Sequence, residues 1–144
     1  MEKQNKVNLL YVCRPAEGGM KKHIIELCNS LDKKRYQIYI ATPEPQSIKK
    51  ELRNSFVKVF ECSLKGELNI FNDLRACWQL IKFIKRHEIH IVHTHGFKAG
   101  LIGRLAAKIT GAPIIINTCH NFIYNDQVKF HYRLIALFIQ RFLN

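Results

Sequence analysis

Three histidines and a pair of glycines stand at positions where α/β proteins often carry out chemistry. His93 and His95 lie in the stretch VHTHG, His120 ends the stretch TCH, and Gly18-Gly19 lies between an apolar run and a helical pattern. Imidazole exchanges a proton near neutral pH, and glycine lets a ligand come close to the backbone. These residue types therefore suggest a polar ligand held by backbone N–H groups and imidazoles.

The glycine pair has two interpretations. The first-turn N–H groups of the helix that follows would attract a phosphate or a sugar hydroxyl. The loop matches neither the G-x-G-x-x-G nor the G-x-x-x-x-G-K-[ST] pattern, so a plain turn remains the alternative. His23, four residues after Gly19, lies one turn into the helix and faces either the same cleft or the surface.

The sequence predicts no metal site. His93 and His95 share one face of a strand and could hold zinc with His120 or Cys119 as a third ligand. However, no Asp or Glu occurs between positions 90 and 125, and no H-E-x-x-H motif is present. Cys119 and His120 are adjacent, so on a strand they face opposite sides and cannot form a nucleophile–base pair.

Hydrophobic patterning predicts which elements position these residues. Strands are expected at 8–13, 36–42, 56–62, 89–94 and 112–120, and helices at 20–31, 47–54, 71–87, 99–110 and 127–143. Strands that alternate with helices form a parallel sheet, here an α/β three-layer, Rossmann-like fold with helices on both faces. The carboxyl ends of the strands then share one edge, where the glycines and histidines would line a common cleft.

Composition limits the function classes. The formal charge is +12, from 23 Lys and Arg against 11 Asp and Glu, which favours anionic partners. Nucleic acid is not expected as a partner, because basic and aromatic residues do not interleave as a stacking platform requires. Five scattered cysteines indicate reduced thiols, and the absence of a long apolar run or signal peptide indicates a cytoplasmic chain.

Two stretches resemble a known family. GGMKKH, at positions 18–23, and IVHTHGFKAGLIGRLAAKITGAPIIINTCHNF, at 91–122, are similar to the N-terminal domain of family-4 glycosyltransferases, retaining enzymes of the GT-B fold. The resemblance implies that residues 1–144 form half of a GT-B fold, the acceptor side, incomplete at its C-terminal end. The C-terminal domain that binds the nucleotide sugar would then be missing or supplied separately.

The resemblance also assigns roles to the site residues. Gly18 and Gly19 would lie against the donor phosphates and the acceptor, and His120 would be the catalytic residue beside the transferred sugar. His95 matches a position that lines the cleft near the acceptor, and His23 joins the substrate-binding residues. No cofactor or metal is implied, since the nucleotide sugar is itself a substrate.

The expected function is therefore transfer of a sugar from a nucleotide sugar to a glycan or polyprenyl-linked lipid acceptor, in cell-envelope polysaccharide or glycolipid synthesis. The isolated chain is expected to be inactive. The basic surface and the segment FHYRLIALFIQRFL, at 130–143, suggest peripheral contact with the anionic inner face of the plasma membrane, although that segment could instead pack on the sheet. The alternative is a non-catalytic module that binds a protein or a membrane.

Overall fold

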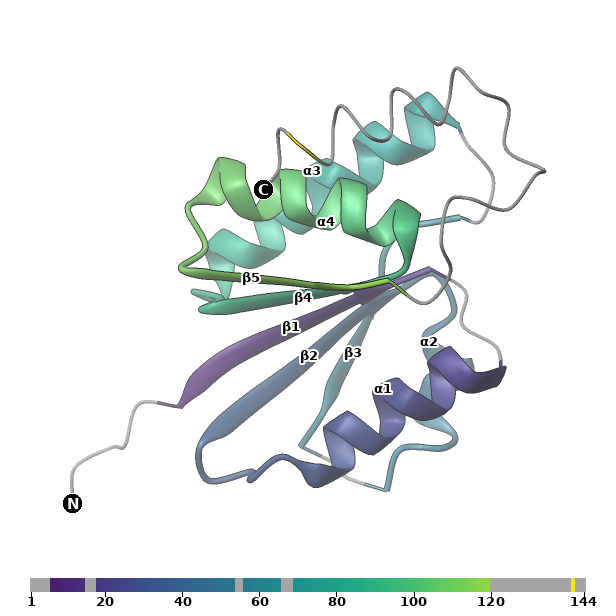
Figure 1. Cartoon of the computed structure of the whole chain (residues 1–144), viewed down its shortest axis with the longest axis vertical. Helices are drawn as coiled ribbons and strands as arrows, with labels where there is room; N and C mark the ends of the chain where they lie inside the picture. The colour runs from purple at the N-terminus through teal and green to yellow at the C-terminus, as the bar shows by residue number, and fades with distance from the viewer. Residues whose placement is uncertain (1–5, 15–17, 54–55, 66–68, 120–140, 142–144) are drawn as a thin grey trace.

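The structure is a computed structural model that describes residues 6–14, 18–53, 56–65, 69–119 and 141. Its elements, in chain order, are β1 Val7–Cys13, α1 Gly18–Ser30, β2 Tyr36–Thr42, α2 Pro45–Lys49, β3 Lys58–Glu61, α3 Ile70–Arg86, β4 Ile91–His95, α4 Phe97–Thr110 and β5 Ile114–Thr118 (Figure 1). The strands form one parallel sheet in the order β3-β2-β1-β4-β5. The predicted α/β class and parallel sheet are confirmed.

Some boundaries differ from the sequence-based prediction. Helix α2 is Pro45–Lys49 rather than 47–54, because proline fits the first helical turn, where its missing N–H costs no hydrogen bond. Strand β3 pairs with β2 over four residues only. The helix predicted at 127–143 lies outside the described residues, apart from Arg141.

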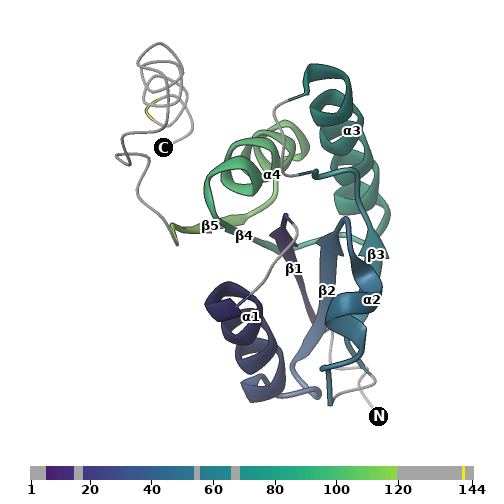
Figure 2. The same ribbon diagram turned by 90° about the vertical axis from the view of Figure 1, so that its right-hand side faces the viewer.

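The described elements make three layers. Figure 2 shows α1 and α2 on one face of the sheet and α3 and α4 on the other. Right-handed crossovers require this arrangement, because the chain first moves outward from β1 to β3 and then returns to the other side of β1 through β4. The predicted three-layer architecture is therefore confirmed.

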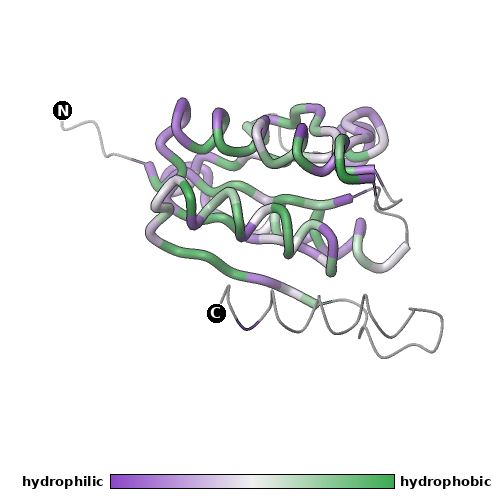
Figure 3. Tube along the Cα trace, turned by 90° about the horizontal axis from the view of Figure 1, so that it is seen from above, coloured by the Kyte–Doolittle hydropathy of each residue, from purple (hydrophilic) through white to green (hydrophobic). Residues whose placement is uncertain are grey.

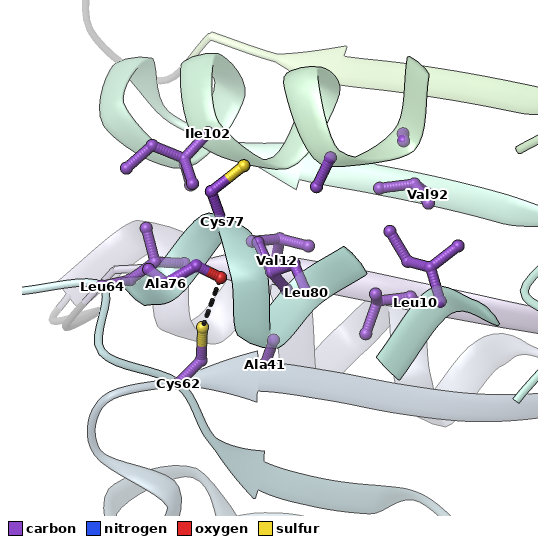
Figure 4. Close-up of a cluster of buried hydrophobic side chains, with 14 of the residues drawn as sticks. Leu10, Val12, Ala41, Cys62, Leu64, Ala76, Cys77, Leu80, Val92 and Ile102 are labelled. Atoms are coloured by element: carbon purple, nitrogen blue, oxygen red, sulfur yellow. Dashed lines mark hydrogen bonds between the residues drawn. The ribbon is translucent and has the colours of Figure 1, made fainter. Parts of the chain in front are cut away.

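Both faces of the sheet bury apolar side chains, as expected of a covered parallel sheet. Leu10 and Val12 point toward α3 and α4, whereas Leu9 and Tyr11 point toward α1. Figure 4 shows the first of these clusters, in which Leu80 of α3 and other inward side chains meet the strands. Along β5, Figure 3 shows the hydrophobic run giving way to hydrophilic residues at the carboxyl end, so polarity increases toward one edge of the sheet.

Helix α4 approaches the sheet closely through two glycines. A Cβ atom added at Gly103 would lie 2.5 Å from Thr94 Cγ2, and one at Gly100 would lie 2.5 Å from Asn117 Oδ1. Thr94 Oγ1 in turn donates a hydrogen bond of 2.8 Å to Asn117 Oδ1. No side chain fits between α4 and the strands β4 and β5 at these two positions.

The first turns of α3 and α4 are joined by an ion pair. Lys98 Nζ lies 2.7 Å from Asp73 Oδ1, and the Lys98 side chain is almost fully buried. Asp73 lies in the first turn of α3, where a carboxylate also complements the helix dipole. The two helices therefore begin side by side.

We predict that Gly103→Ala lowers the free energy of unfolding by about 1–3 kcal/mol, because the added methyl group must displace packed atoms of Thr94. Urea denaturation measures this loss. Gly19→Ala is the control: a Cβ there has nothing within 4 Å, so this variant should keep or slightly raise stability. Equal stabilities of the two variants would contradict the close packing of α4.

Candidate functional site

The candidate site lies at the carboxyl edge of the sheet, where β1 and β4 are neighbours. The chain leaves β1 toward α1 on one face and leaves β4 toward α4 on the other face (Figure 1). Such a reversal of direction opens a crevice at the strand ends, the usual ligand site in open α/β sheets. The residues that follow β1 and β4 are therefore the candidates for ligand contact.

Gly18 and Gly19 form the exposed start of α1 rather than a loop before it. Gly18 has φ +59°, in the left-handed region that favours glycine, and a Cβ at either position would have nothing within 4 Å. Their N–H groups belong to the first turn of a helix, whose donors have no partner within the helix. The structure thus leaves open space beside a set of backbone donors.

Gly96 is a third glycine at this edge, and it was not among the predicted site residues. It is the N-cap of α4, with φ +85°, and offers no side-chain hydrogen bond to the helix. Its N–H donates to the Thr118 carbonyl oxygen at 2.8 Å, and a Cβ added at Gly96 would lie 3.9 Å from Met20 Sδ. The turns after β1 and β4 are therefore close together. The strand–glycine–helix pattern in VHTHGF is the sequence signal that could have identified Gly96.

The histidines gather on the face of the sheet that α1 covers. The ring centroids of His93 and His95 are 4.3 Å apart, and His95 meets the edge of the His23 ring at 5.8 Å. Tyr11 lies 5.4 Å from His93 and 5.5 Å from His95. The prediction that His93 and His95 share a face is confirmed, and His23 joins them from α1.

The histidines of this cluster differ in how deeply they are buried. His95 is completely buried and forms the floor of the edge, whereas His93 and His23 are half-buried. His93 Nε2 makes a 2.8 Å hydrogen bond with Thr118 Oγ1. Burial also raises the pKa of Tyr11 well above its ordinary value, so its phenol stays protonated. The floor is therefore an aromatic layer in which His95 and Tyr11 are buried, with Gly18 and Gly19 exposed at its rim.

His120, the predicted catalytic residue, lies outside the described residues. Thr118 ends β5 at the same carboxyl edge, and Cys119 follows it directly before His120. Of the predicted site residues, the structure therefore brings Gly18, Gly19, His23 and His95 to one edge and leaves the position of His120 undescribed.

A shallow hollow adjoins Gly18 on the side of α2. It has a volume of about 540 Å³ and is lined by Gly18, Lys21, Lys22, Ser47 and Glu51. Lys21 Nζ lies 2.5 Å from Glu51 Oε1, while Lys22 is exposed. Two lysines against one carboxylate make this side of the site net positive, which suits an anionic ligand.

The described residues contain neither a cluster of metal ligands nor a membrane-spanning helix. No group of three or more His, Cys, Asp or Glu side chains within these ranges could hold a metal ion. None of the helices in the same ranges is long and apolar enough to cross a bilayer.

The reactivity of the cysteine thiols tests which of these side chains are buried and whether Cys119, at this edge, is exposed. Cys13, Cys28, Cys62 and Cys77 are buried, and burial raises their thiol pKa values, to about 12 for the first three. Cys119 is exposed at the end of β5. Since the thiolate is the reactive form, we predict one fast-reacting thiol in the native chain and five in denaturant.

Titration with a chromogenic disulfide reagent measures both numbers. Cys119→Ser should remove the fast phase, and Cys77→Ser should leave it unchanged. Two or more fast thiols in the native chain would show that the buried clusters open more easily than this packing allows.

Fold and site together define a Rossmann-like domain of the GT-B kind. The sequence profile of glycosyltransferase family 4 matches residues 17–144. The chain belongs to this family.

Two characterised relatives are similar in sequence. An Escherichia coli UDP-Gal:alpha-D-GlcNAc-diphosphoundecaprenol alpha-1,3-galactosyltransferase is 25% identical over 139 residues, which are 93% of this chain and 36% of that protein. The Staphylococcus aureus capsular polysaccharide biosynthesis glycosyltransferase CapM is 29% identical over 107 residues, 74% of this chain and 27% of that one. The chain thus spans about a third of the length of these relatives.

Solved structures confirm the fold. A glycosyltransferase from Rickettsia africae superposes with a TM-score of 0.68 at 24% identity, and Anabaena HepE in complex with UDP superposes with 0.67 at 14%. Each match covers 92% of this chain and 35% of the other chain. The structural likeness agrees with half of a GT-B fold.

Proposed function

We propose that this chain is the acceptor-side domain of a glycosyltransferase that moves a sugar from a nucleotide sugar to a lipid-linked glycan. The observation that carries the proposal is the pair of glycine turns, at Gly18 and Gly96, that meet at the crevice of a family-4 domain. The first turn of α1, which begins at Gly18, leaves backbone donors beside a net positive hollow. Backbone N–H groups at helix starts bind phosphate oxygens well.

The named relatives support the kind of substrate. The Escherichia coli relative acts on a GlcNAc-diphosphoundecaprenol acceptor with a UDP sugar as donor, and HepE was crystallised with UDP. A diphosphate-linked acceptor fits the anion-binding character of the edge. We therefore infer a polyprenyl-diphosphate or related lipid-linked acceptor for this chain, in polysaccharide or glycolipid synthesis, at the cytoplasmic side of the membrane.

The reaction itself is proposed to follow the retaining course of the family. His120 would stand beside the transferred sugar and stabilise charge that develops during transfer. His95, buried beneath the edge, would act by positioning His23 and His93, whose rings it contacts. The donor would be held mainly by residues outside this chain, since the match covers only 36% of the Escherichia coli relative.

Binding of the acceptor tests the role of the glycine turn. We predict that Gly18→Ala weakens binding of a short-chain prenyl-diphosphate GlcNAc by about tenfold or more, because its methyl group occupies the space that the diphosphate requires and one charge-assisted hydrogen bond is lost. Isothermal titration calorimetry on the 144-residue chain measures the affinity.

Gly111→Ala is a matched control. Gly111 also has a positive φ and open space around its Cβ position, but it ends α4 at the opposite edge of the sheet. Both variants should lose a similar 1–2 kcal/mol of stability, and only Gly18→Ala should lose affinity. Equal affinities of the two variants would refute the proposed site.

Sugar transfer tests the division of labour between domains. We predict no measurable transfer from UDP-galactose to the same acceptor by the 144-residue chain alone, because one wall of the crevice cannot both hold the donor and align it with the acceptor. Radiolabelled donor and thin-layer chromatography give the readout, with a complete family-4 enzyme as the positive control. Turnover by the chain alone would show that its residues suffice for donor binding.

A further inference from the structure

The outward face of α3 carries an unusual run of exposed apolar side chains. Ile70, Phe71, Leu74 and Trp78 are between 57% and 80% exposed. Residues three and four positions apart lie on the same side of a helix, so Phe71, Leu74 and Trp78 form one continuous stripe. Apolar residues grouped in this way on a surface indicate an interaction site.

The same face becomes basic toward the end of the helix. Lys82, Lys85 and Arg86 are exposed on the last turns, and Lys82 Nζ lies 3.6 Å from the centre of the Trp78 ring. Asp73, the single acidic residue of α3, is ion-paired with Lys98 of α4. The surface that α3 presents is therefore apolar at one end and cationic at the other.

The apolar end lies at the edge of the candidate site. Helix α3 starts at the carboxyl edge of the sheet, and its first turn is tied to the first turn of α4 by the Asp73–Lys98 ion pair. Helix α4 itself starts directly after Gly96. Figure 2 shows α3 beside α4 on the face of the sheet opposite α1. A partner that binds the outward face of α3 would therefore leave the α1 side of the molecule uncovered.

We propose that this α3 ridge (Ile70, Phe71, Leu74, Trp78, Lys82 and Lys85) docks on an anionic lipid bilayer. Tryptophan prefers the membrane interface, and a helix lying in the interface plane combines an apolar stripe with lysines. A formal charge of +12 complements an anionic surface rather than a typical protein partner. The proposal deepens the proposed function, because it brings the acceptor's edge of the chain to the lipid in which such an acceptor resides.

Trp78 makes the test direct, because it is the only tryptophan in the chain. Vesicles of phosphatidylglycerol and phosphatidylcholine should shift its fluorescence to shorter wavelength, and brominated lipids should quench it. Vesicles of phosphatidylcholine alone should give a much weaker effect, and added salt should weaken binding, since charges are screened beyond about 10 Å at 0.1 M. An unchanged Trp78 spectrum with anionic vesicles at low salt would overturn the proposal.

Two pairs of variants locate the contact. Phe71→Ser should weaken binding to anionic vesicles by about tenfold or more, whereas Ile109→Ser, which removes an exposed apolar side chain of α4, should leave it unchanged. Replacing Lys82 and Lys85 by Gln should weaken binding about 30-fold. The same change at Lys33 and Lys34, exposed in the turn between α1 and β2, should have a much smaller effect.

Circular dichroism confirms that each variant is folded, and sedimentation of the free chain reports self-association. If both members of a pair weaken binding equally, the contact is not on α3. If the chain dimerises through the same residues and ignores vesicles, the ridge is a protein interface and the proposal is wrong. Acceptor binding is measured on a short-chain compound without vesicles, so the two proposals can fail separately.

Discussion

The close contact between α4 and the sheet is the constraint on which the rest of this domain depends. Gly100 and Gly103 leave no room for side chains above Asn117 and Thr94, so the position of α4 is determined by backbone contact. That position places Gly96 at the end of β4, beside Met20 at the start of α1. Through the Asp73–Lys98 ion pair it also determines where α3 begins. The site edge and the α3 ridge are consequently parts of one rigid arrangement.

The chemistry of the edge follows from unequal burial. His95 and Tyr11 are desolvated beneath α1, whereas the glycines above them are exposed. A floor of buried side chains leaves the backbone donors at the rim open to a ligand. In the proposed function the imidazoles would shape and support the crevice, and the positive charge would come from the lysines beside it. Such a division would suit the proposed recognition of a diphosphate.

Much of the fold could be predicted from the sequence, because each strand is a short apolar run with breakers at its ends and each longer helix has a clear period. The shared edge of Gly18, Gly19 and His95 followed from the parallel order of the strands. The burial of His95 could not be predicted, since it depends on α1 lying over β1 and β4. Gly96 was missed because a single glycine after a strand does not by itself reveal a positive φ. The ends of α2 and β3 could not be predicted, because they depend on contacts between layers that the local sequence pattern does not reveal.

The α3 pattern shows how sequence and structure carry different information. Helical spacing by itself groups Leu74 and Trp78 with the core residues Cys77 and Ile84 on one side of α3. The structure separates them, because α3 packs through Ala76, Leu80 and Ile84, leaving Leu74 and Trp78 outside. Burial of Leu74 and Trp78 would also have stabilised the packing of this helix on the sheet. Packing the smaller Ala76 inward lets α3 lie near α4 and leaves the bulkier Trp78 exposed for the contact with lipid that we propose.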